Sequence, residues 1–299
     1  MKLHKIISYL SIKLSLIFFK LRMPISYVIF NKLYSSLILK KNINSKLIKL
    51  YDKNGFVKLD INFKTEILDI EKDLSVQEVN PTRKIEVNST RKIIKLNKNK
   101  QEEFLQKIIN KLTPTINQLK QYYNSEIYIA KIMATRNLNR DAKADGKYKE
   151  LYSNHYHNDG YLITYFKIFI NLMDITENDG PLHIIYKNEK KKFIKLTNYK
   201  NRHNYLALDK SDILYKNTGK KGDVFLFSTP LCFHKAGIPK NYRDNLGMEL
   251  IAVPHKMKIS LSDIYNDDFE WMIKITKPYS NVELFKKFID HYRYKKTNF

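Results

Sequence analysis

Three side chains of metal-binding types stand at two places in the sequence: His157 and Asp159 in the segment His-Asn-Asp, and His234 much further along. Residues two apart in a strand point to the same face, so His157 and Asp159 can converge on one ion. His234 follows the apolar run 222–227, which predicts a strand whose end faces a cavity. Two histidines and one carboxylate are a facial set that holds iron(II) and leaves coordination positions open. The pattern predicts a non-haem iron site.

Arg243 comes nine residues after His234 and just before another β-type run. A guanidinium forms two parallel hydrogen bonds with a carboxylate, so Arg243 is the candidate partner for the distal carboxylate of a keto-acid cosubstrate. A His-x-Asp tripeptide by itself is more often a turn capped by the aspartate than a metal site. The hypothesis therefore depends on the elements that surround these residues.

Helical periodicity dominates the chain up to about residue 125, most clearly over 102–119, and an extended segment over 54–61 interrupts it. Short β-type runs separated by turn signals follow at 127–134, 166–175, 182–186, 223–228 and 248–253. An amphipathic pattern over 282–292 predicts a last helix. The fold class that we expect is α+β, mainly β, with a sheet sandwich or barrel preceded and flanked by helices.

The segment 154–182 contains Asn-His-Tyr-His-Asn-Asp-Gly-Tyr and later Phe-Lys-Ile-Phe-Ile-Asn-Leu-Met-Asp-Ile-Thr-Glu-Asn-Asp-Gly-Pro-Leu. It resembles the phytanoyl-CoA dioxygenase family of iron(II)/2-oxoglutarate oxygenases, in which an aromatic-His-x-Asp-Gly segment precedes a strand and then Glu-Asn-Gly-Pro-Leu. The run Gly-Asp-Val-Phe-Leu-Phe at 222–227, followed by His234 and Arg243, is similar to the second landmark of the family. A fainter third likeness is Tyr-Asp-Lys-Asn-Gly-Phe-Val before the extended segment. Together these segments cover most of residues 50–255.

The resemblance implies a double-stranded β-helix, a cupin-like jelly-roll of two facing sheets with iron at its open end. It implies that His157, Asp159 and His234 are the iron ligands and carry the catalysis. His155 would share a face with His157 and could replace Asp159 in a His-x-His pair. The family register, with Tyr156 in the aromatic position, favours His157 and Asp159, and we expect His155 to line the cavity.

The resemblance also implies the cosubstrate site and the reaction. Arg243 matches the residue that binds the C5 carboxylate of 2-oxoglutarate. We expect Phe169 where the family commonly has a tryptophan beside the cosubstrate, Asn245 as a further contact next to Arg243, and Lys131 as the alternative clamp. The implied reaction uses O2 and 2-oxoglutarate to hydroxylate an unactivated C–H bond of a small organic substrate. Halogenating relatives lack the carboxylate ligand, so Asp159 indicates hydroxylation.

The sequence departs from the family at two points. Many members have a serine two residues after the second histidine, where this chain has Ala236. The usual Pro-Gly-Ser-His after Gly-Pro-Leu is replaced by Tyr-Lys-Asn-Glu at 186–189, which alters a turn and removes a histidine. One alternative is therefore a catalytically degenerate, basic jelly-roll that binds an anionic polymer or a membrane surface. A second is a cupin-like metalloenzyme without a keto acid, which leaves Arg243 without a role.

Composition sets the broad class. Hydrophobic residues make up 43% of the 299 residues and aromatic residues 13%, which is enough for a packed core and excludes wholesale disorder. The formal net charge is +24, but the basic residues are overwhelmingly lysine, whereas phosphate-binding surfaces usually recruit arginine. We therefore expect a small-molecule substrate and no specific nucleic-acid partner. The single cysteine, Cys232, excludes an internal disulfide and a multi-cysteine metal site and suits the reducing cytoplasm.

We predict one domain over 46–299, preceded by an amphipathic helical extension over 1–45 that packs on it. The extension has no uncharged apolar run of about 18 residues, so we expect no transmembrane span. A helix that lies on a membrane surface remains the alternative for this extension. The lysine-rich segment 187–221 is predicted to be an insertion that joins strands near the metal-bearing end. We expect it to attract an anionic substrate.

Overall fold

The computed structural model describes the middle of the chain: residues 39, 43–78, 91–139, 153–159, 165–198, 208 and 211–253. Only residues 39 and 43–45 of the predicted extension over 1–45 belong to this part, and the predicted last helix over 282–292 lies outside it. Within the described residues, no helix combines the length and the apolar character needed to cross a membrane.

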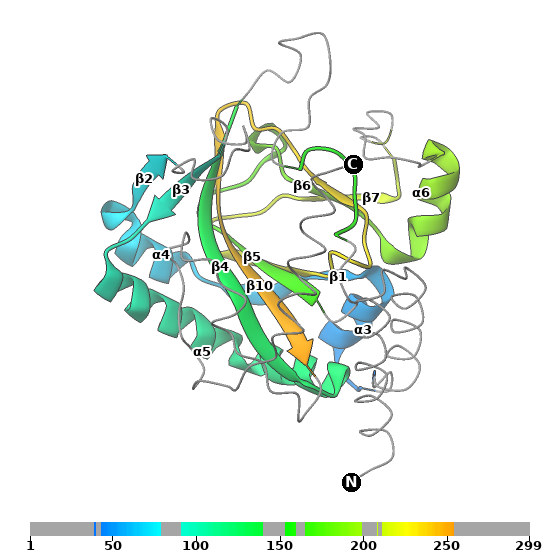
Figure 1. Cartoon of the computed structure of the whole chain (residues 1–299), viewed down its shortest axis with the longest axis horizontal. Coiled ribbons are helices and arrows are strands. Elements are labelled where there is room, and N and C mark those ends of the chain that lie inside the picture. The colour runs from blue at the N-terminus through cyan, green and yellow to red at the C-terminus, as the bar shows by residue number, and fades with distance from the viewer. Residues whose placement is uncertain are drawn as a thin grey trace, which may run out of the picture.

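Two antiparallel sheets form the core of the described structure (Figure 1). The large sheet has the spatial order β1 (Phe56–Asn62), β8 (Asp223–Phe227), β5 (Tyr165–Asn171), β10 (Tyr242–Val253), β4 (Glu126–Leu138), β3 (Arg91–Lys95) and β2 (Ser75–Glu78). The small sheet has the order β7 (Leu214–Asn217), β6 (Leu182–Ile185) and β9 (His234–Ala236). A β-bridge between His157 and His234 adds one more extended segment beside β9.

The order of the elements identifies the fold. From β4 onward the chain passes back and forth between the two sheets. The strands β4, β5, β8 and β10 lie in the large sheet, and the His157 segment, β6, β7 and β9 lie in the small sheet. Each sheet thereby receives four elements, and both sheets contribute side chains to one cavity between them. This arrangement is a double-stranded β-helix, or jelly-roll. The predicted fold class, mainly β with flanking helices, is confirmed.

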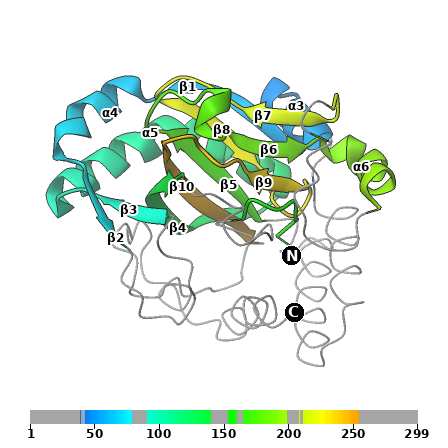
Figure 2. The same cartoon turned by 90° about the horizontal axis from the view of Figure 1, so that it is seen from above.

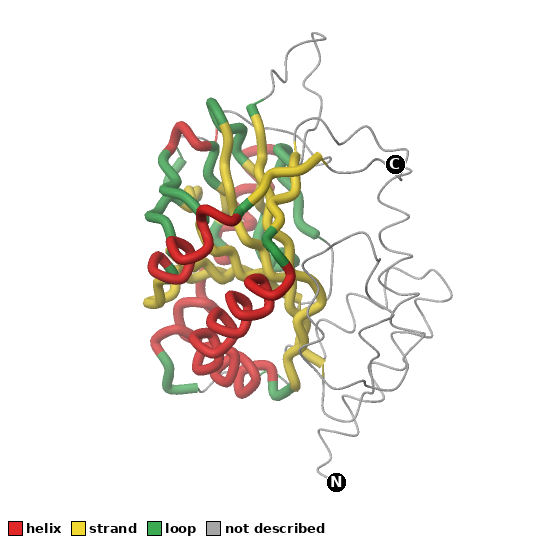
Figure 3. The backbone as a smooth tube through the Cα atoms, turned by 90° about the vertical axis from the view of Figure 1, so that its left-hand side faces the viewer, coloured by secondary structure: helices red, strands yellow, loops and turns green. Residues whose placement is uncertain are grey.

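The face of the large sheet that points away from the cavity packs on helices. Phe166 and Ile168 of β5 and Leu246 and Met248 of β10 are buried in one apolar cluster with residues from three helices. These helices are α3 (Lys46–Asn54), α4 (Lys64–Ile70) and α5 (Lys98–Tyr123). Figures 2 and 3 show them gathered on one side of the long strands. Because side chains alternate along a strand, the odd-numbered residues of β5 and β10 face the small sheet instead.

Most of the strongly periodic segments form the predicted elements. The predicted helix over 102–119 lies within α5, and the extended segment over 54–61 contains most of β1. The β-type runs correspond to β4, β5, β6, β8 and the second half of β10. The lysine-rich segment 187–221 contains a short helix, α6 (Lys190–Thr197), and the edge strand β7, so part of it belongs to the small sheet.

We expect Phe166→Ala to destabilise the fold strongly. The Phe166 ring is fully buried and stacks on the Tyr123 ring of α5 with 5.4 Å between ring centroids. Replacing it leaves a cavity between sheet and helix, which costs about 3–5 kcal/mol of unfolding free energy. Urea unfolding followed by circular dichroism measures the change. Leu196→Ala, at a side chain that is 59% exposed, is the control and should shift stability by less than about 0.5 kcal/mol. Equal losses in both variants would contradict this packing.

Candidate metal site

The structure brings His157, Asp159 and His234 together in the interior between the two sheets. The Nε2 atom of His157 lies 3.5 Å from Oδ1 of Asp159, and Nε2 of His234 lies 4.0 Å from the same oxygen. One ligand atom from each of the three residues lies within 4.8 Å of the others. A divalent ion at the centre of this group would meet two imidazole nitrogens and one carboxylate oxygen. That donor set fits iron(II) with further positions open.

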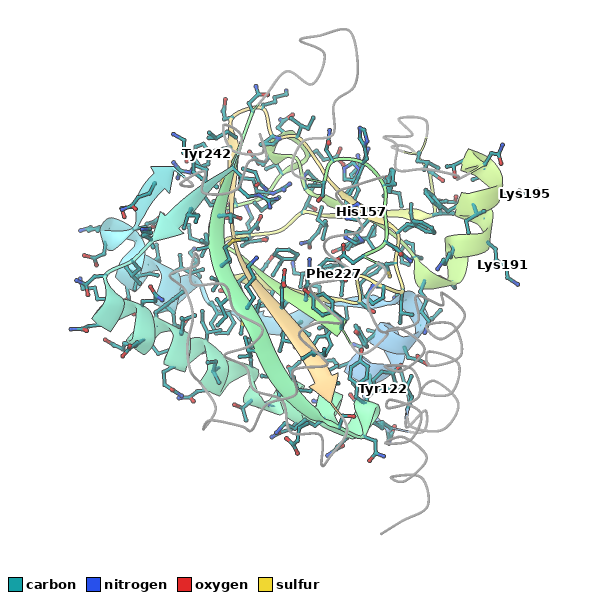
Figure 4. The ribbon with its side chains drawn as sticks, in the orientation of Figure 1. Tyr122, His157, Lys191, Lys195, Phe227 and Tyr242 are labelled. Atoms are coloured by element: carbon teal, nitrogen blue, oxygen red, sulfur yellow. The ribbon has the colours of Figure 1, made fainter. Side chains whose placement is uncertain are left out.

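A backbone bridge places the two histidines next to each other. The amide of His157 donates to the carbonyl of His234 at 3.0 Å, and the amide of His234 donates back at 2.8 Å. Residues paired in this way project their side chains to the same face, and the two imidazole centroids are 4.4 Å apart. Asp159 follows two residues after His157, and its amide donates to the carbonyl of Thr229. Figure 4 shows His157 in the interior of the molecule near Phe227, whose ring contacts His234 edge-on.

Backbone carbonyls set the orientation of both imidazoles. The Nδ1 atom of His157 is 2.7 Å from the carbonyl oxygen of His155, and Nδ1 of His234 is 3.1 Å from that of Cys232. A carbonyl can only accept, so each Nδ1 carries the hydrogen and each Nε2 presents a lone pair toward Asp159. This is the tautomer that a metal-binding histidine requires.

The electrostatics of the group suit metal binding at neutral pH. Burial lowers the pKa of His234 to about 3, with the neighbouring His157 acting in the same direction, so this imidazole is neutral. Burial alone would raise the pKa of Asp159, but the nearby Lys167 ammonium, the largest of the lowering influences, helps to hold that pKa well below the usual range. A neutral histidine and an ionised aspartate are the protonation states in which these side chains bind a metal.

A cavity of about 170 Å³ extends from the three residues across the floor formed by the large sheet. The register places four residues of β10 on this floor, each opposite side chains from neighbouring strands that also line the cavity. The opposed sets are Arg243 with Asn137, Asn245 with Thr135 and Asn171, Gly247 with Met133 and Phe169, and Glu249 with Lys131 and Lys167. The floor therefore changes from polar at Arg243, through an apolar middle, to charged at Glu249.

The predicted cosubstrate residues all line this cavity. Arg243 is only 5% exposed and donates from Nη1 to the carbonyl of Gly237 at 3.3 Å. The Asn245 amide donates to Oδ1 of Asn171, and the Phe169 ring stacks on Phe227. The fourth predicted residue, Lys131, lines the cavity at its charged end.

The expectation that His155 lines the cavity does not hold, whereas the attraction of an anionic substrate by the segment 187–221 stays a prediction. Among the described residues that line the cavity, His155 does not appear; its backbone carbonyl orients His157 instead. The described lysines of 187–221 do not line the cavity either, and Asn217 is the described residue of that segment that does. Figure 4 shows Lys191 and Lys195 on α6, at the outer edge of the molecule. Of the described residues of this segment, 190–197 form the helix α6 and 214–217 form the edge strand β7.

Sequence reasoning missed several residues of the site. Lys167 lies between Asp159 and Glu249 and pairs with both carboxylates, and Arg91 donates from Nε to Oδ1 of Asn137 at the arginine end. A signal did exist: Lys167 and Glu249 are charged residues inside otherwise apolar strands. Assigning them to the cavity required the cross-strand register, which the sequence alone does not give.

The fold and the site together define a class: a double-stranded β-helix with a buried two-histidine, one-aspartate group. No family model matches the chain, and no curated protein matches its sequence. Similar solved structures include HygX from Streptomyces hygroscopicus with nickel and 2-oxoglutarate bound, at 13% identity and a TM-score of 0.45 over 80% of this chain and 96% of that one. EctD from S. alaskensis with bound iron is 14% identical, with a TM-score of 0.45 over 72% and 81% of the chains.

A third similar structure is SnoN, a non-heme alpha-ketoglutarate-dependent epimerase from nogalamycin biosynthesis, at 11% identity and a TM-score of 0.41 over 69% and 82% of the chains. Likenesses at this level carry no functional argument, so the function is argued below from the site itself. Membership of the phytanoyl-CoA dioxygenase family stays a prediction.

We expect the wild-type protein to bind one iron(II) or cobalt(II) per chain. Alanine at His157, Asp159 or His234 removes one of three donors and should lower the affinity at least about 10-fold, because even changes to the partners of metal ligands cost that much. Anaerobic titration calorimetry measures stoichiometry and affinity. His155→Gln is the matched control, since its side chain lies outside the group and should leave binding intact. Full binding by all three alanine variants would contradict the assignment.

Proposed function

We propose that the protein is an iron(II)- and 2-oxoglutarate-dependent oxygenase that hydroxylates an unactivated C–H bond of a small organic substrate. The observation that carries the proposal is the buried group of His157, Asp159 and His234 in the same cavity as Arg243. The three residues would hold iron(II), and Arg243 would bind the far carboxylate of 2-oxoglutarate. A dicarboxylate keto acid is the kind of cosubstrate that can reach a metal at one end and a guanidinium at the other.

When bound, iron(II) supplies the activation of O2 and the oxidation of 2-oxoglutarate to succinate and CO2. The residues of this chain supply binding, orientation and exclusion of water. The side-chain amides of Asn245 and Asn171 are hydrogen-bonded to each other at 3.3 Å. Asn245 follows Arg243 by two residues on the same face of β10, so these amides offer donors and acceptors to a carboxylate bound at Arg243. Phe169 and Phe227, stacked at 5.6 Å, form an apolar wall that shields the middle of the cavity from water.

The absence of a side chain at Gly247 leaves room for the Phe169 ring. A methyl group at position 247 would meet the Phe169 ring at 3.0 Å, so a larger residue would push the ring out of place. On the opposite sheet Ala236 lines the cavity, where a serine would have placed a hydroxyl. The cosubstrate would therefore depend on Arg243 and the asparagines for its polar contacts.

The cavity favours a small substrate with an anionic group. Its volume is about 170 Å³. The described lining carries four cationic side chains, Arg91, Lys131, Lys167 and Arg243, and two carboxylates, Asp159 and Glu249. An excess of cationic groups around a partly enclosed cavity attracts carboxylates and phosphates.

Two measurements test the proposed activity. Anaerobic protein with iron(II) and 2-oxoglutarate should develop a metal-to-ligand charge-transfer band in the visible range, which requires both components at one site. Aerobic protein should then form succinate from 2-oxoglutarate, slowly alone and faster with a substrate from a panel of small anionic metabolites. Protein that binds iron(II) but shows neither the band nor succinate would contradict the proposal.

We expect Arg243→Lys to raise the KM for 2-oxoglutarate by about 10-fold or more, because a hydrogen bond to a charged group contributes about 1.5–3 kcal/mol. Affinity for iron(II) should change little. The matched control is Arg136→Lys: Arg136 lies on the opposite face of the same strand pair, where it binds Asp244 at 2.7 and 2.9 Å. That variant should keep the wild-type KM. Succinate formation at varied 2-oxoglutarate measures both, and an unchanged KM in Arg243→Lys would place the clamp elsewhere.

A further inference from the structure

Lys167 lies on the cavity floor next to the candidate metal ligands. Its ammonium is 3.3 Å from Oδ2 of Asp159 and 3.6 Å from Oε1 of Glu249, and its side chain is only 20% exposed. It comes from the middle of β5, directly opposite Glu249 on β10 and Phe227 on β8. The ammonium therefore bridges a carboxylate of the large sheet and the one carboxylate of the metal group.

The two oxygens of Asp159 have different surroundings. Oδ1 faces both imidazoles, at 3.5 and 4.0 Å from their Nε2 atoms, whereas Oδ2 faces Lys167. An ion placed among the two histidines and Asp159 would meet Oδ1 first. The second oxygen already forms an ion pair with the Lys167 ammonium at 3.3 Å, and such pairs are screened less in a buried site than at the surface.

Asp159 needs such a partner more than the histidines do. Both imidazoles are oriented by backbone carbonyls and joined by the paired backbone bridge. The amide of Asp159 donates to the Thr229 carbonyl, a bond that places the backbone but does not set the rotation of the carboxylate. Lys167 ties the carboxylate to two adjacent strands of the large sheet. Metal-bound carboxylates commonly depend on outer partners of this type.

We propose that Lys167 is a positioning residue that holds Oδ2 of Asp159 away from the metal and so keeps Asp159 a one-oxygen ligand. The inference rests on the proposed function only in that the site binds a divalent metal. With two histidines and one carboxylate oxygen, a six-coordinate ion retains three positions. If Asp159 bound through both oxygens it would occupy one of those three. A keto acid that binds through two oxygens would then leave no position for O2.

Glu249 completes the arrangement. Its carboxylate lies beside the Lys167 ammonium and is paired in register with Lys131 on its other side. A lysine has a long, flexible stem, so the position of its charge depends on what holds it. Glu249 fixes the ammonium over the floor of the cavity, within reach of Asp159.

Cobalt(II) binding tests this role without relying on turnover, because the d–d absorption of cobalt(II) changes with coordination number. Lys167→Met keeps the length and bulk of the side chain and removes the charge. We expect this variant to bind one cobalt(II) per chain with an altered d–d band. It should bind 2-oxoglutarate to the cobalt form about 10-fold more weakly or worse than wild type, as expected for loss of an outer partner. Lys167→Arg should restore both the band and the affinity.

The controls separate the alternatives. Lys131→Met removes a lysine that is paired in register with the same glutamate, on the other side of β10, and should keep the wild-type cobalt(II) band. If Lys167→Met fails to fold, Lys167→Gln provides the same loss of charge with a polar side chain. A wild-type band and a wild-type 2-oxoglutarate affinity in the charge-removing variant would overturn the positioning role.

Failure of the proposed function gives different results. Wild-type protein that binds cobalt(II) but forms no succinate would contradict the oxygenase and leave the band comparison decisive for Lys167. Wild-type protein that binds no cobalt(II) would overturn both proposals.

Discussion

The candidate site depends on one pair of backbone hydrogen bonds, those that join His157 to His234. The two residues lie 77 positions apart in the sequence (234 − 157), and the bridge fixes their imidazoles on the same face of the small sheet. Asp159 then reaches the same point because it follows His157 at the two-residue spacing of extended chain. Further backbone bonds, from the Ala236 amide to the Ser153 carbonyl and from the Asp159 amide to the Thr229 carbonyl, hold the same segment on either side of the bridge.

The two faces of the large sheet have different roles: one packs on the helices and stabilises the fold, and the other lines the cavity. On β5 and β10 the even-numbered residues pack against α3, α4 and α5, and burial of this apolar surface stabilises the fold. The odd-numbered residues over 167–171 and 243–249 line the cavity and include three of its charged side chains, Lys167, Arg243 and Glu249. Because side chains alternate along the strand, Leu246 packs in the core while its neighbour Asn245 lines the cavity. A shift of one residue in register would exchange these roles along the whole strand.

The polar and charged side chains of the cavity floor are arranged in order along β10. Arg243 stands at one end, Glu249 with Lys167 at the other, and Asn245 and Gly247 between them. In the proposed enzyme this order separates the group that binds the far carboxylate of the cosubstrate from the groups that orient the metal ligand. Both ends are built on the most extensively paired strand of the large sheet, so their spacing is held by the ladder rather than by loops.

The sequence by itself determined the residue types, their order and the fold class. Short β-type runs separated by turn signals predicted the strands, and the spacing of His157, Asp159, His234 and Arg243 predicted the donor group and the guanidinium that the structure places in one cavity. The tertiary structure alone decided which charged residues join them. Lys167 and Glu249 stand out in the sequence as charged residues in apolar runs, but only the pairing of β5 with β10 puts one beside the other, and only the fold brings Asp159 to Lys167. Cross-strand register is a property of two segments at once, and no local pattern in either of them records it.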